Sequence, residues 1–333
     1  MKITINTKTY LPNIGGIENY VEMLRKEFEK KNINTKIIAD TKSSQNQKNI
    51  YRNINFLEKI KLFKKSNLIV MINYTLRDFL FFIIFKKKII INHQINYETD
   101  NFIGKVLSYI KINLSRYFIN APCSKYVSKI IKKNCFVIPN CYDDKLFYKS
   151  KKNKKNEFIF CGRLVKDKGA HVLIDCFIKL LRHNDKLTLG IIGDGPEKLN
   201  LLKKIKNKEL KKNIKFYGFV RGKKLKKIIE NYKFMVIPSL WNEPFGIVAL
   251  EGIALNNTVI AFKNGGLNEA IKDCGIVVNP NKTSLYNAMK KVIKSERKYT
   301  NKKFISKCQA HLKNYTPAVI VEKYLKLYEK FIR

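Results

Sequence analysis

The sequence predicts an α/β protein built from two doubly wound parallel sheets. The chain has 333 residues, 45% of them hydrophobic, which is enough to form two cores of ordinary size. Short apolar runs alternate with amphipathic segments along both halves, as in repeated β–α units. A cationic stretch without periodicity, residues 149–156, separates the halves and predicts a linker. We therefore expect a first domain over residues 1–150, a second over 151–316 and a terminal helix over 317–333.

The first half predicts six strands and four helices. Apolar, β-branched runs mark the strands at 2–6, 35–39, 68–73, 88–92, 117–120 and 135–138. Apolar residues at helical spacing mark the helices at 17–31, 77–85, 102–115 and 125–133. The residues after Met1 read as the first strand and not as a signal peptide. The apolar run 79–85 is far shorter than the roughly 20 residues of a membrane-spanning helix, so we expect none.

The second half repeats the same alternation. Its strands are expected at 157–162, 187–192, 214–218, 234–238, 259–262 and 276–278. Its helices are expected at 169–181, 197–206, 223–232, 267–272 and 284–294, with one more that begins near Phe245. The final segment, residues 317–332, is amphipathic and predicts a last helix.

Two glutamates eight residues apart, Glu243 and Glu251, flank the start of the helix near Phe245. Pro244 disfavours α conformation in the residue before it and suits the first position of a helix. Glu251 then lies in the second turn, where its carboxylate suits sugar hydroxyls. An ordinary helix that carries two glutamates is the alternative. The strands on either side and the paired glycines Gly265-Gly266 favour a ligand crevice.

Backbone N–H groups at Phe245, Gly246 and Ile247 lack partners within such a helix. A helix start with free N–H groups attracts phosphate. Together with the two carboxylates, this predicts a pocket for a phosphate flanked by hydroxyls, such as a nucleotide sugar.

The order of the motifs along the chain resembles the retaining GT-B glycosyltransferases with an E-x7-E motif, the glycosyl transferases group 1. The motifs are Gly15-Gly16-Ile17-Glu18, Asn92-His93-Gln94, Val137-Ile138-Pro139-Asn140, Cys161-Gly162-Arg163-Leu164, Lys168-Gly169, Ile192-Gly193-Asp194-Gly195-Pro196-Glu197, Pro238-Ser239 and the two glutamates. The resemblance implies two Rossmann-like domains facing a central cleft, with the acceptor on the first and the donor on the second. It also implies a C-terminal helix that crosses back to the first domain. The chain departs from the family at Gly252, where alanine is usual, and at Asn256-Asn257, where the family has Gly-x-Pro.

The resemblance assigns roles to residues that have ordinary alternatives. Arg163 and Lys168 lie between a strand end and a helix, where two cations can neutralise a diphosphate leaving group; surface charge is the alternative. Gly16 would lie near the donor diphosphate, or else in a flexible turn. His93 would contact the transferred sugar, or else be a hydrogen-bonded core histidine. Val220 and Arg221 would border the base.

The sequence therefore predicts a retaining, metal-independent glycosyltransferase that needs no cofactor, because no D-x-D cluster is present to hold a metal. The catalytic set is His93, Glu243, Arg163 and Lys168, and the donor-binding set is Gly16, Phe245, Gly246, Ile247 and Glu251. The donor would be a UDP-, GDP- or ADP-linked sugar. The acceptor would be a glycan or lipid-linked molecule of cell-surface polysaccharide or lipopolysaccharide-type assembly. A GT-B-like protein that binds a nucleotide sugar without turnover is an alternative.

The formal net charge of +41 leaves three interpretations open. The charge can attract the anionic lipid of the cytoplasmic membrane face, or it can bind nucleic acid. It can also be a solvated surface shaped by an AT-rich coding sequence. The basic, aromatic segment 102–133 fits helices that lie on a membrane and fits equally well helices whose apolar face packs on the sheet. Lysines spread along the chain argue against nucleic acid. The seven cysteines, odd in number and without C-x-x-C, indicate reduced thiols. We expect a cytoplasmic protein, peripheral on the inner membrane face.

Overall fold

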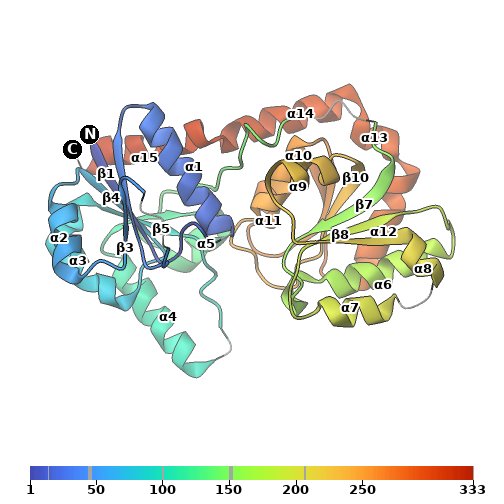
Figure 1. Cartoon of the computed structure of the whole chain (residues 1–333), viewed down its shortest axis with the longest axis horizontal. Helices are drawn as coiled ribbons and strands as arrows, with labels where there is room; N and C mark the ends of the chain where they lie inside the picture. The colour runs from blue at the N-terminus through green and yellow to red at the C-terminus, as the bar shows by residue number, and fades with distance from the viewer. Residues whose placement is uncertain (14, 44–46, 100, 150–152, 206–207, 333) are drawn as a thin grey trace. The chain divides into compact units, whose positions relative to one another are not determined.

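The computed structural model describes residues 1–13, 15–43, 47–99, 101–149, 153–205 and 208–332. The chain forms two compact units (Figure 1). The first combines Met1–Cys141 with Tyr315–Arg333, and the second is Tyr142–Asn314. The expected division at residues 150 and 151 therefore falls inside the second unit.

The expected linker, residues 149–156, lies partly outside the described residues, at 150–152. Its described end is packed against the second unit. The Lys154 ammonium donates to the Tyr232 carbonyl oxygen over 2.7 Å, and burial lowers the pKa of Lys154 to about 7. Charge and lack of periodicity did not reveal this packing, because it depends on a partner far along the chain.

Six parallel strands form the sheet of the first unit, in the order β3-β2-β1-β4-β5-β6 (Figure 1). The strands are β1 Lys2–Thr7, β2 Asn34–Ala39, β3 Ile50–Arg52, β4 Leu68–Ile72, β5 Ile89–His93 and β6 Ile119–Pro122. On the central strand, Ile5 lies opposite Ile37 of β2 and Val70 of β4. The strand order reverses between β1 and β4, which is where ligands bind in open sheets of this kind.

Helices cover both faces of this sheet. They are α1 Gly16–Lys30, α2 Phe56–Lys64, α3 Phe79–Phe85, α4 Phe102–Ser115, α5 Lys125–Ile131 and α15 Pro317–Phe331, with 3-10 turns η1 Leu76–Asp78 and η2 Lys86–Lys88. Because side chains alternate along a strand, Val70 packs in the core under α1 and α15, while Ile69 packs with α2 and α3. The Tyr20 and Tyr324 hydroxyls, 3.1 Å apart and buried, join α1 to α15.

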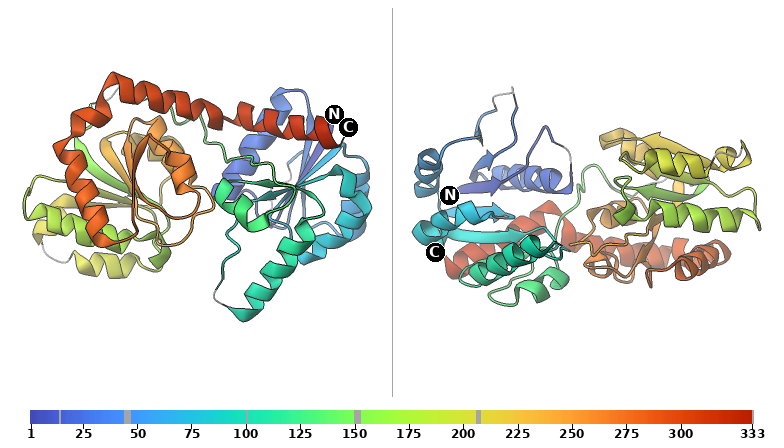
Figure 2. Two further views of the ribbon diagram at one scale, coloured as in Figure 1. Left: turned by 180° about the vertical axis from the view of Figure 1, so that it is seen from behind. Right: turned by 90° about the horizontal axis from the view of Figure 1, so that it is seen from below.

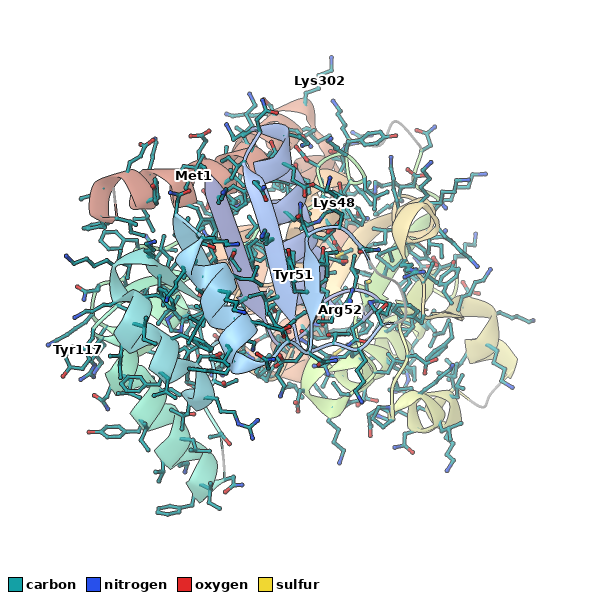
Figure 3. All side chains as sticks on the ribbon, turned by 60° about the vertical axis from the view of Figure 1, so that its left-hand side comes forward. Met1, Lys48, Tyr51, Arg52, Tyr117 and Lys302 are labelled. Carbon is teal, nitrogen blue, oxygen red and sulfur yellow. The ribbon has the colours of Figure 1, made fainter. Side chains whose placement is uncertain are left out.

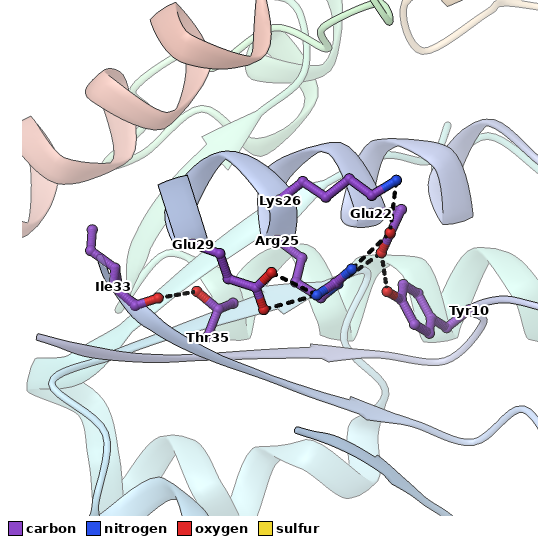
Figure 4. Close-up of polar contacts among 7 residues, drawn as sticks. All are labelled: Tyr10, Glu22, Arg25, Lys26, Glu29, Ile33 and Thr35. Carbon is purple, nitrogen blue, oxygen red and sulfur yellow. Dashed lines mark hydrogen bonds and ion pairs between the residues drawn. The ribbon is translucent and has the colours of Figure 1, made fainter. Parts of the chain in front are cut away.

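An ion-pair network fixes α1 to the loop after β1 (Figure 4). Arg25 lies between two carboxylates, donating to Glu22 over 2.8 Å and to Glu29 over 2.7 Å. The Tyr10 hydroxyl donates to Glu22 as well. Spacings of three and four residues place all three charges on one face of the helix, so the loop that precedes α1 is held by the helix itself.

The second unit has a sheet of the same kind, in the order β12-β11-β10-β7-β8-β9. Its strands are β7 Asn156–Cys161, β8 Leu189–Ile192, β9 Ile214–Gly218, β10 Tyr232–Ile237, β11 Thr258–Phe262 and β12 Gly275–Val278. Its helices are α6 Ala170–Leu181, α7 Lys198–Lys204, α8 Lys208–Asn213, α9 Gly222–Ile229, α10 Ile247–Ala254, α11 Leu267–Ile271, α12 Lys282–Lys294, α13 Glu296–Thr300 and α14 Lys302–Leu312, with 3-10 turns η3 Lys166–Lys168 and η4 Lys313–Tyr315. The predicted α/β class with two parallel sheets is confirmed. No helix among the described residues is long and apolar enough to span a bilayer.

Two local predictions in the first unit were wrong. Residues 135–138 make a single bridge, between Cys135 and Asn120, instead of a strand, because Lys132 and Asn134 turn the chain with positive φ just before it. The sequence reading also missed β3 and α2. Asn55 and Glu58 form a capping box at the start of α2, and this N-x-x-E pattern was the available signal.

Candidate functional site

The start of α10 differs from the expected one by two residues. The helix begins at Ile247 and not near Phe245, because Gly246 precedes it with φ 103, outside the helical region. Among the residues that the structure describes, no acceptor takes a hydrogen bond from the N–H of Ile247 or Val248. The Phe245 side chain is buried. The first turn of α10 therefore presents backbone donors, beginning two residues later than expected.

Glu243 is held on three sides. Its backbone carbonyl accepts from the Gly266 N–H over 2.7 Å. One side-chain oxygen accepts from the Ser239 hydroxyl over 2.6 Å and pairs with the Lys168 ammonium. Gly265, with φ 61, lies so close that a Cβ there would come within 2.1 Å of the Glu243 carbonyl oxygen. This close approach explains the paired glycines, because only glycine allows it.

Lys168 reaches Glu243 because the loop after β7 packs on the loop after β10. The Leu240 N–H donates to the Asp167 carbonyl over 2.7 Å. Gly169, with φ 69, makes the contact possible, since a Cβ there would lie 1.9 Å from the Pro238 carbonyl oxygen. The Lys168 ammonium also lies 5.3 Å from the centre of the Trp241 ring. The ion pair is only one-fifth exposed on the lysine side and less on the glutamate side, so water screens it weakly.

Arg163 lies two residues beyond β7, and its side chain is exposed. In the described part of the chain it has no carboxylate partner. The turn at Gly193 packs against the loop that carries Arg163. The Leu164 N–H donates to the Asp194 carbonyl over 2.9 Å, and a Cβ at Gly193 would lie 1.8 Å from the Gly162 carbonyl oxygen. The backbone that carries Arg163 is therefore held in place, while its unpaired guanidinium group is available to a ligand.

Glu251 has an unusual protonation equilibrium. Burial, together with the negative charge of Asp143, raises the pKa of its carboxyl to about 7. No described group donates a hydrogen bond to this carboxyl, although its residue keeps partial exposure. Asp143 is itself fixed, accepting from the Lys145 and Leu146 N–H groups over 3.1 and 3.0 Å. Burial and the charge of Glu251 together raise the pKa of the neighbouring Cys161 thiol to about 12.

The sequence reading missed Asp143, Cys161 and Trp241 as members of this cluster. Trp241 is the only tryptophan of the chain and lies two residues before Glu243, so it could have been found. Asp143 could not, because its influence on Glu251 depends on the fold. Val220 and Arg221 lie between β9 and α9, and no contact places them at the cluster.

The surroundings of His93 favour the second interpretation left open for it, a hydrogen-bonded core histidine. It ends β5, as expected, but its side chain is fully buried. One ring nitrogen lies 2.7 Å from Asn120 Oδ1 and the other 2.6 Å from the Tyr97 hydroxyl. The Asn120 amide nitrogen donates to the carbonyls of residues 115, 118 and 133, so Oδ1 must accept from His93 Nε2–H. Burial lowers the pKa of His93 to about 4, and a neutral core histidine describes it best.

Gly16 is the first residue of α1 and is exposed. It belongs to the first unit, as does His93, whereas the other predicted site residues belong to the second. The structure brings Glu243 and Lys168 into direct contact and places Arg163 and the start of α10 on neighbouring loops of one sheet edge.

A second hollow lies in the first unit. A cavity of about 390 Å³ opens at the carboxyl ends of β1 and β4, where the strand order reverses. Lys8, Lys59 and Arg77 bring positive charge to its lining. Lys59 pairs with Asp40 at 3.7 Å. Lys8 and Arg77 have no carboxylate partner in the described residues. Asp40 and Asp78 also line the cavity, so the positive charge that it offers to a ligand is that of Lys8 and Arg77.

Comparison with known proteins places these features in a family. The model of the family "Glycosyl transferases group 1" matches residues 143–310. The chain is 42% identical over 115 residues to an uncharacterized glycosyltransferase, MJ1607, of Methanocaldococcus jannaschii, covering 34% of this chain and 29% of that protein. It is 31% identical over 127 residues to the alpha-D-kanosaminyltransferase of Streptomyces kanamyceticus, covering 38% and 33%. The chain thus matches about a third of the length of these relatives.

Solved structures of similar fold cover the whole chain. The Anabaena protein Alr3699/HepE, crystallised in complex with UDP, superposes with a TM-score of 0.79 at 17% identity, over 99% of this chain and all of that one. A glycosyltransferase from Rickettsia africae superposes with a TM-score of 0.81 at 17% identity, over 100% and 98%. At these identities the likeness concerns the fold.

Proposed function

The chain belongs to the family of glycosyl transferases group 1, and we propose on this basis that it transfers a sugar from a nucleotide-sugar donor with retention of configuration. The observation that carries the proposal is the cluster at one edge of the second sheet. A lysine–glutamate pair, a free guanidinium and the unpaired donors of a helix start lie on adjacent loops. The UDP complex of HepE, which shares the fold, supports a nucleotide donor.

We assign the donor diphosphate to the positive end of this cluster. Arg163, Lys168 and the N–H groups at the start of α10 would surround its oxygens. Negative charge grows on the diphosphate as the bond to the sugar breaks, so fixed donors at this point stabilise the transition state more than the bound donor. We propose that these groups act without a metal ion.

The two glutamates have different tasks in this proposal. Glu251, to which no described group donates a hydrogen bond, accepts hydrogen bonds from the ribose hydroxyls. Glu243 accepts from the donor sugar and keeps the Lys168 ammonium in position through their ion pair. Because Ser239 shares the Glu243 oxygen, the carboxylate stays fixed when Lys168 turns toward phosphate.

The reaction that fits this arrangement is a front-face transfer. The bond between the sugar C1 and the phosphate oxygen breaks while a bond from the acceptor oxygen forms on the same face. The acceptor proton passes to the departing phosphate oxygen, so no side chain has to become a covalent nucleophile. Retention and freedom from metal are proposals that rest on the family and on this site.

We propose that the acceptor binds the first unit, in the cavity between β1 and β4. The unpaired Lys8 and Arg77 favour an acceptor with a phosphate or carboxylate near its reacting sugar. This charge suits a lipid-linked or glycan acceptor of cell-surface polysaccharide assembly, made on the cytoplasmic face of the membrane.

A thermal-shift screen with UDP-, GDP- and ADP-linked sugars tests the donor proposal. A ligand at one hundred times its Kd adds about 2.7 kcal/mol to the stability of the state it binds. One base should raise the melting temperature, and Glu251→Ala should remove that rise. Stabilisation by none of the donors would overturn the proposal. Stabilisation without any turnover of the donor would favour a binding protein instead.

A further inference from the structure

Helix α4 presents most of its apolar side chains to the surface of the unit. Of its 14 residues only Ser115 is buried. Phe102 is 77% exposed and Tyr109 68%. The exposed apolar side chains of α4, here called the α4 face, are Phe102, Ile103, Val106, Leu107, Tyr109 and Ile110. Exposed apolar side chains gathered on one helix indicate an interaction site.

Hydrogen bonds hold the C-terminal half of α4. Figures 1 and 2 show α4 extending away from the sheet of the first unit. The Tyr74 hydroxyl donates to the Lys111 carbonyl, and the Asn120 amide donates to the Ser115 carbonyl over 2.8 Å. These bonds hold the C-terminal half. The α4 face lies mainly on the other half, so it is presented on a rigid support.

Positive charge accompanies the apolar residues. Residues 102–134 contain seven lysines or arginines and no aspartate or glutamate. Lys105 and Lys111 lie on α4 itself, and Arg116 and the exposed Tyr117 follow it. Figure 3 shows Tyr117 pointing away from the ribbon. Helix α5, in contrast, packs its Val127 and Ile131 into the unit, so within residues 102–134 the exposed apolar side chains lie on α4 and directly after it.

This combination of charge and apolarity identifies the partner. A second copy of the chain would bring two faces of equal positive charge together, which electrostatic repulsion opposes. An anionic bilayer offers acidic headgroups for the cations and a hydrocarbon boundary for the apolar side chains. With 14 residues, α4 is also shorter than the roughly 20 that cross a bilayer and has the length of a helix that lies at its surface.

We propose that the α4 face inserts into the headgroup boundary of an anionic membrane, with Lys105, Lys111 and Arg116 contacting acidic lipid. The proposal names the surface at which the proposed enzyme would meet a lipid-linked acceptor. It depends on the proposed function only for this purpose, because binding to vesicles needs no donor and no turnover.

Co-sedimentation with vesicles tests the proposal. The wild-type chain should bind phosphatidylcholine vesicles that contain phosphatidylglycerol at least tenfold better than pure phosphatidylcholine, and salt should weaken this binding. The triple variant Phe102→Ser, Ile103→Ser, Tyr109→Ser should lose at least nine-tenths of the binding. Leu199→Ser with Phe219→Ser, at exposed apolar positions of the second unit, should bind like the wild type.

The outcomes separate the explanations. Equal sedimentation of the triple variant and the wild type overturns the proposal, and so does equal binding to neutral and anionic vesicles. A dimer that the triple variant abolishes would identify a second copy as the partner and overturn it as well. Unchanged melting temperature and unchanged stabilisation by a nucleotide sugar in the triple variant show that the proposed donor site is intact. A failed vesicle assay is therefore distinct from a failed function.

A spectroscopic measurement keeps the test independent of the serine variants. Trp241 is the only tryptophan, so Trp241→Phe with Tyr109→Trp places a single reporter on the α4 face. Its emission should shift to the blue with anionic vesicles and be quenched by brominated lipid. Emission that stays as in water, with the protein bound to the vesicle, would place another surface at the membrane and overturn the proposal.

Discussion

The affinity for a nucleotide sugar should fall steeply in acid because of one carboxyl group. Burial, assisted by Asp143, raises the pKa of Glu251 to about 7 from the ordinary 4.5. Ribose hydroxyls donate hydrogen bonds to a carboxylate, so the donor binds the ionised form. The ionised fraction falls from about nine-tenths near pH 8 to roughly one-hundredth near pH 5. The affinity for the nucleotide sugar should therefore fall between these two pH values by a factor on the order of 100, or about 2.7 kcal/mol.

Titration calorimetry across this range measures the effect. The ligand should be an intact nucleotide sugar, because its diphosphate lacks the secondary ionisation that a terminal phosphate shows near pH 6. Glu251→Gln should bind more weakly and with little change between the two ends of the range. Asp143→Asn keeps the oxygen that accepts from Lys145 and Leu146 and removes the charge, so it should move the midpoint to lower pH.

Two results would refute this reasoning. A wild-type affinity that does not change between the ends of the range would mean that Glu251 does not contact the donor or is already ionised. A slope that persists in Glu251→Gln would assign the titration to another group. A midpoint unmoved by Asp143→Asn would leave burial as the whole cause of the raised pKa.

The remaining predictions concern the leaving group, a buried histidine and one glycine. Lys168→Ala and Arg163→Ala should lower kcat more than they raise KM, because both side chains act on negative charge that grows in the transition state. Wild-type turnover should persist in EDTA. Activity that is lost in EDTA and restored only by a divalent ion would contradict the metal-free proposal. Burial lowers the pKa of His93 to about 4, so the unfolded chain takes up the proton first as the pH falls. The free energy of unfolding should therefore decrease by up to about 3 kcal/mol between about pH 6.5 and about pH 4. Urea unfolding should show a smaller decrease over this range in His93→Gln. Gly169→Ala should destabilise the fold by several kcal/mol more than Gly222→Ala, because both have positive φ but only Gly169 faces a carbonyl oxygen within 1.9 Å of an added Cβ; equal melting temperatures would show that the two loops separate without cost.

The two parallel sheets could be predicted from the sequence, but not every strand could. Repeated apolar runs and helical segments were enough to predict two parallel sheets, because central strands such as β4, β5 and β11 are buried along their whole length. The strand β3 has three half-buried residues, too few to give a pattern. The segment after Asn134 has the composition of a strand, but it meets the sheet at one residue only.

Some features of the candidate site could likewise be predicted from the sequence, and others could not. The spacing of Glu243 and Glu251 and the cations after β7 were visible in the sequence. That Lys168 and Glu243 form an ion pair was not, since they lie 75 residues apart and meet only when two loops pack. The burial of His93 was hidden for a related reason, because its partners Tyr97 and Asn120 become partners only in the folded unit. The assignments of site residues stay predictions until they are tested.

Proton NMR during donor turnover tests the central claim most directly. The wild-type chain is incubated with the donor that stabilises it, in the presence of EDTA, and the anomeric proton of the first product is followed before mutarotation. The account predicts consumption of the donor with the original configuration at C1, and no consumption by Lys168→Ala with Arg163→Ala. A product of inverted configuration, or turnover that stops in EDTA and returns with a divalent ion, would contradict it.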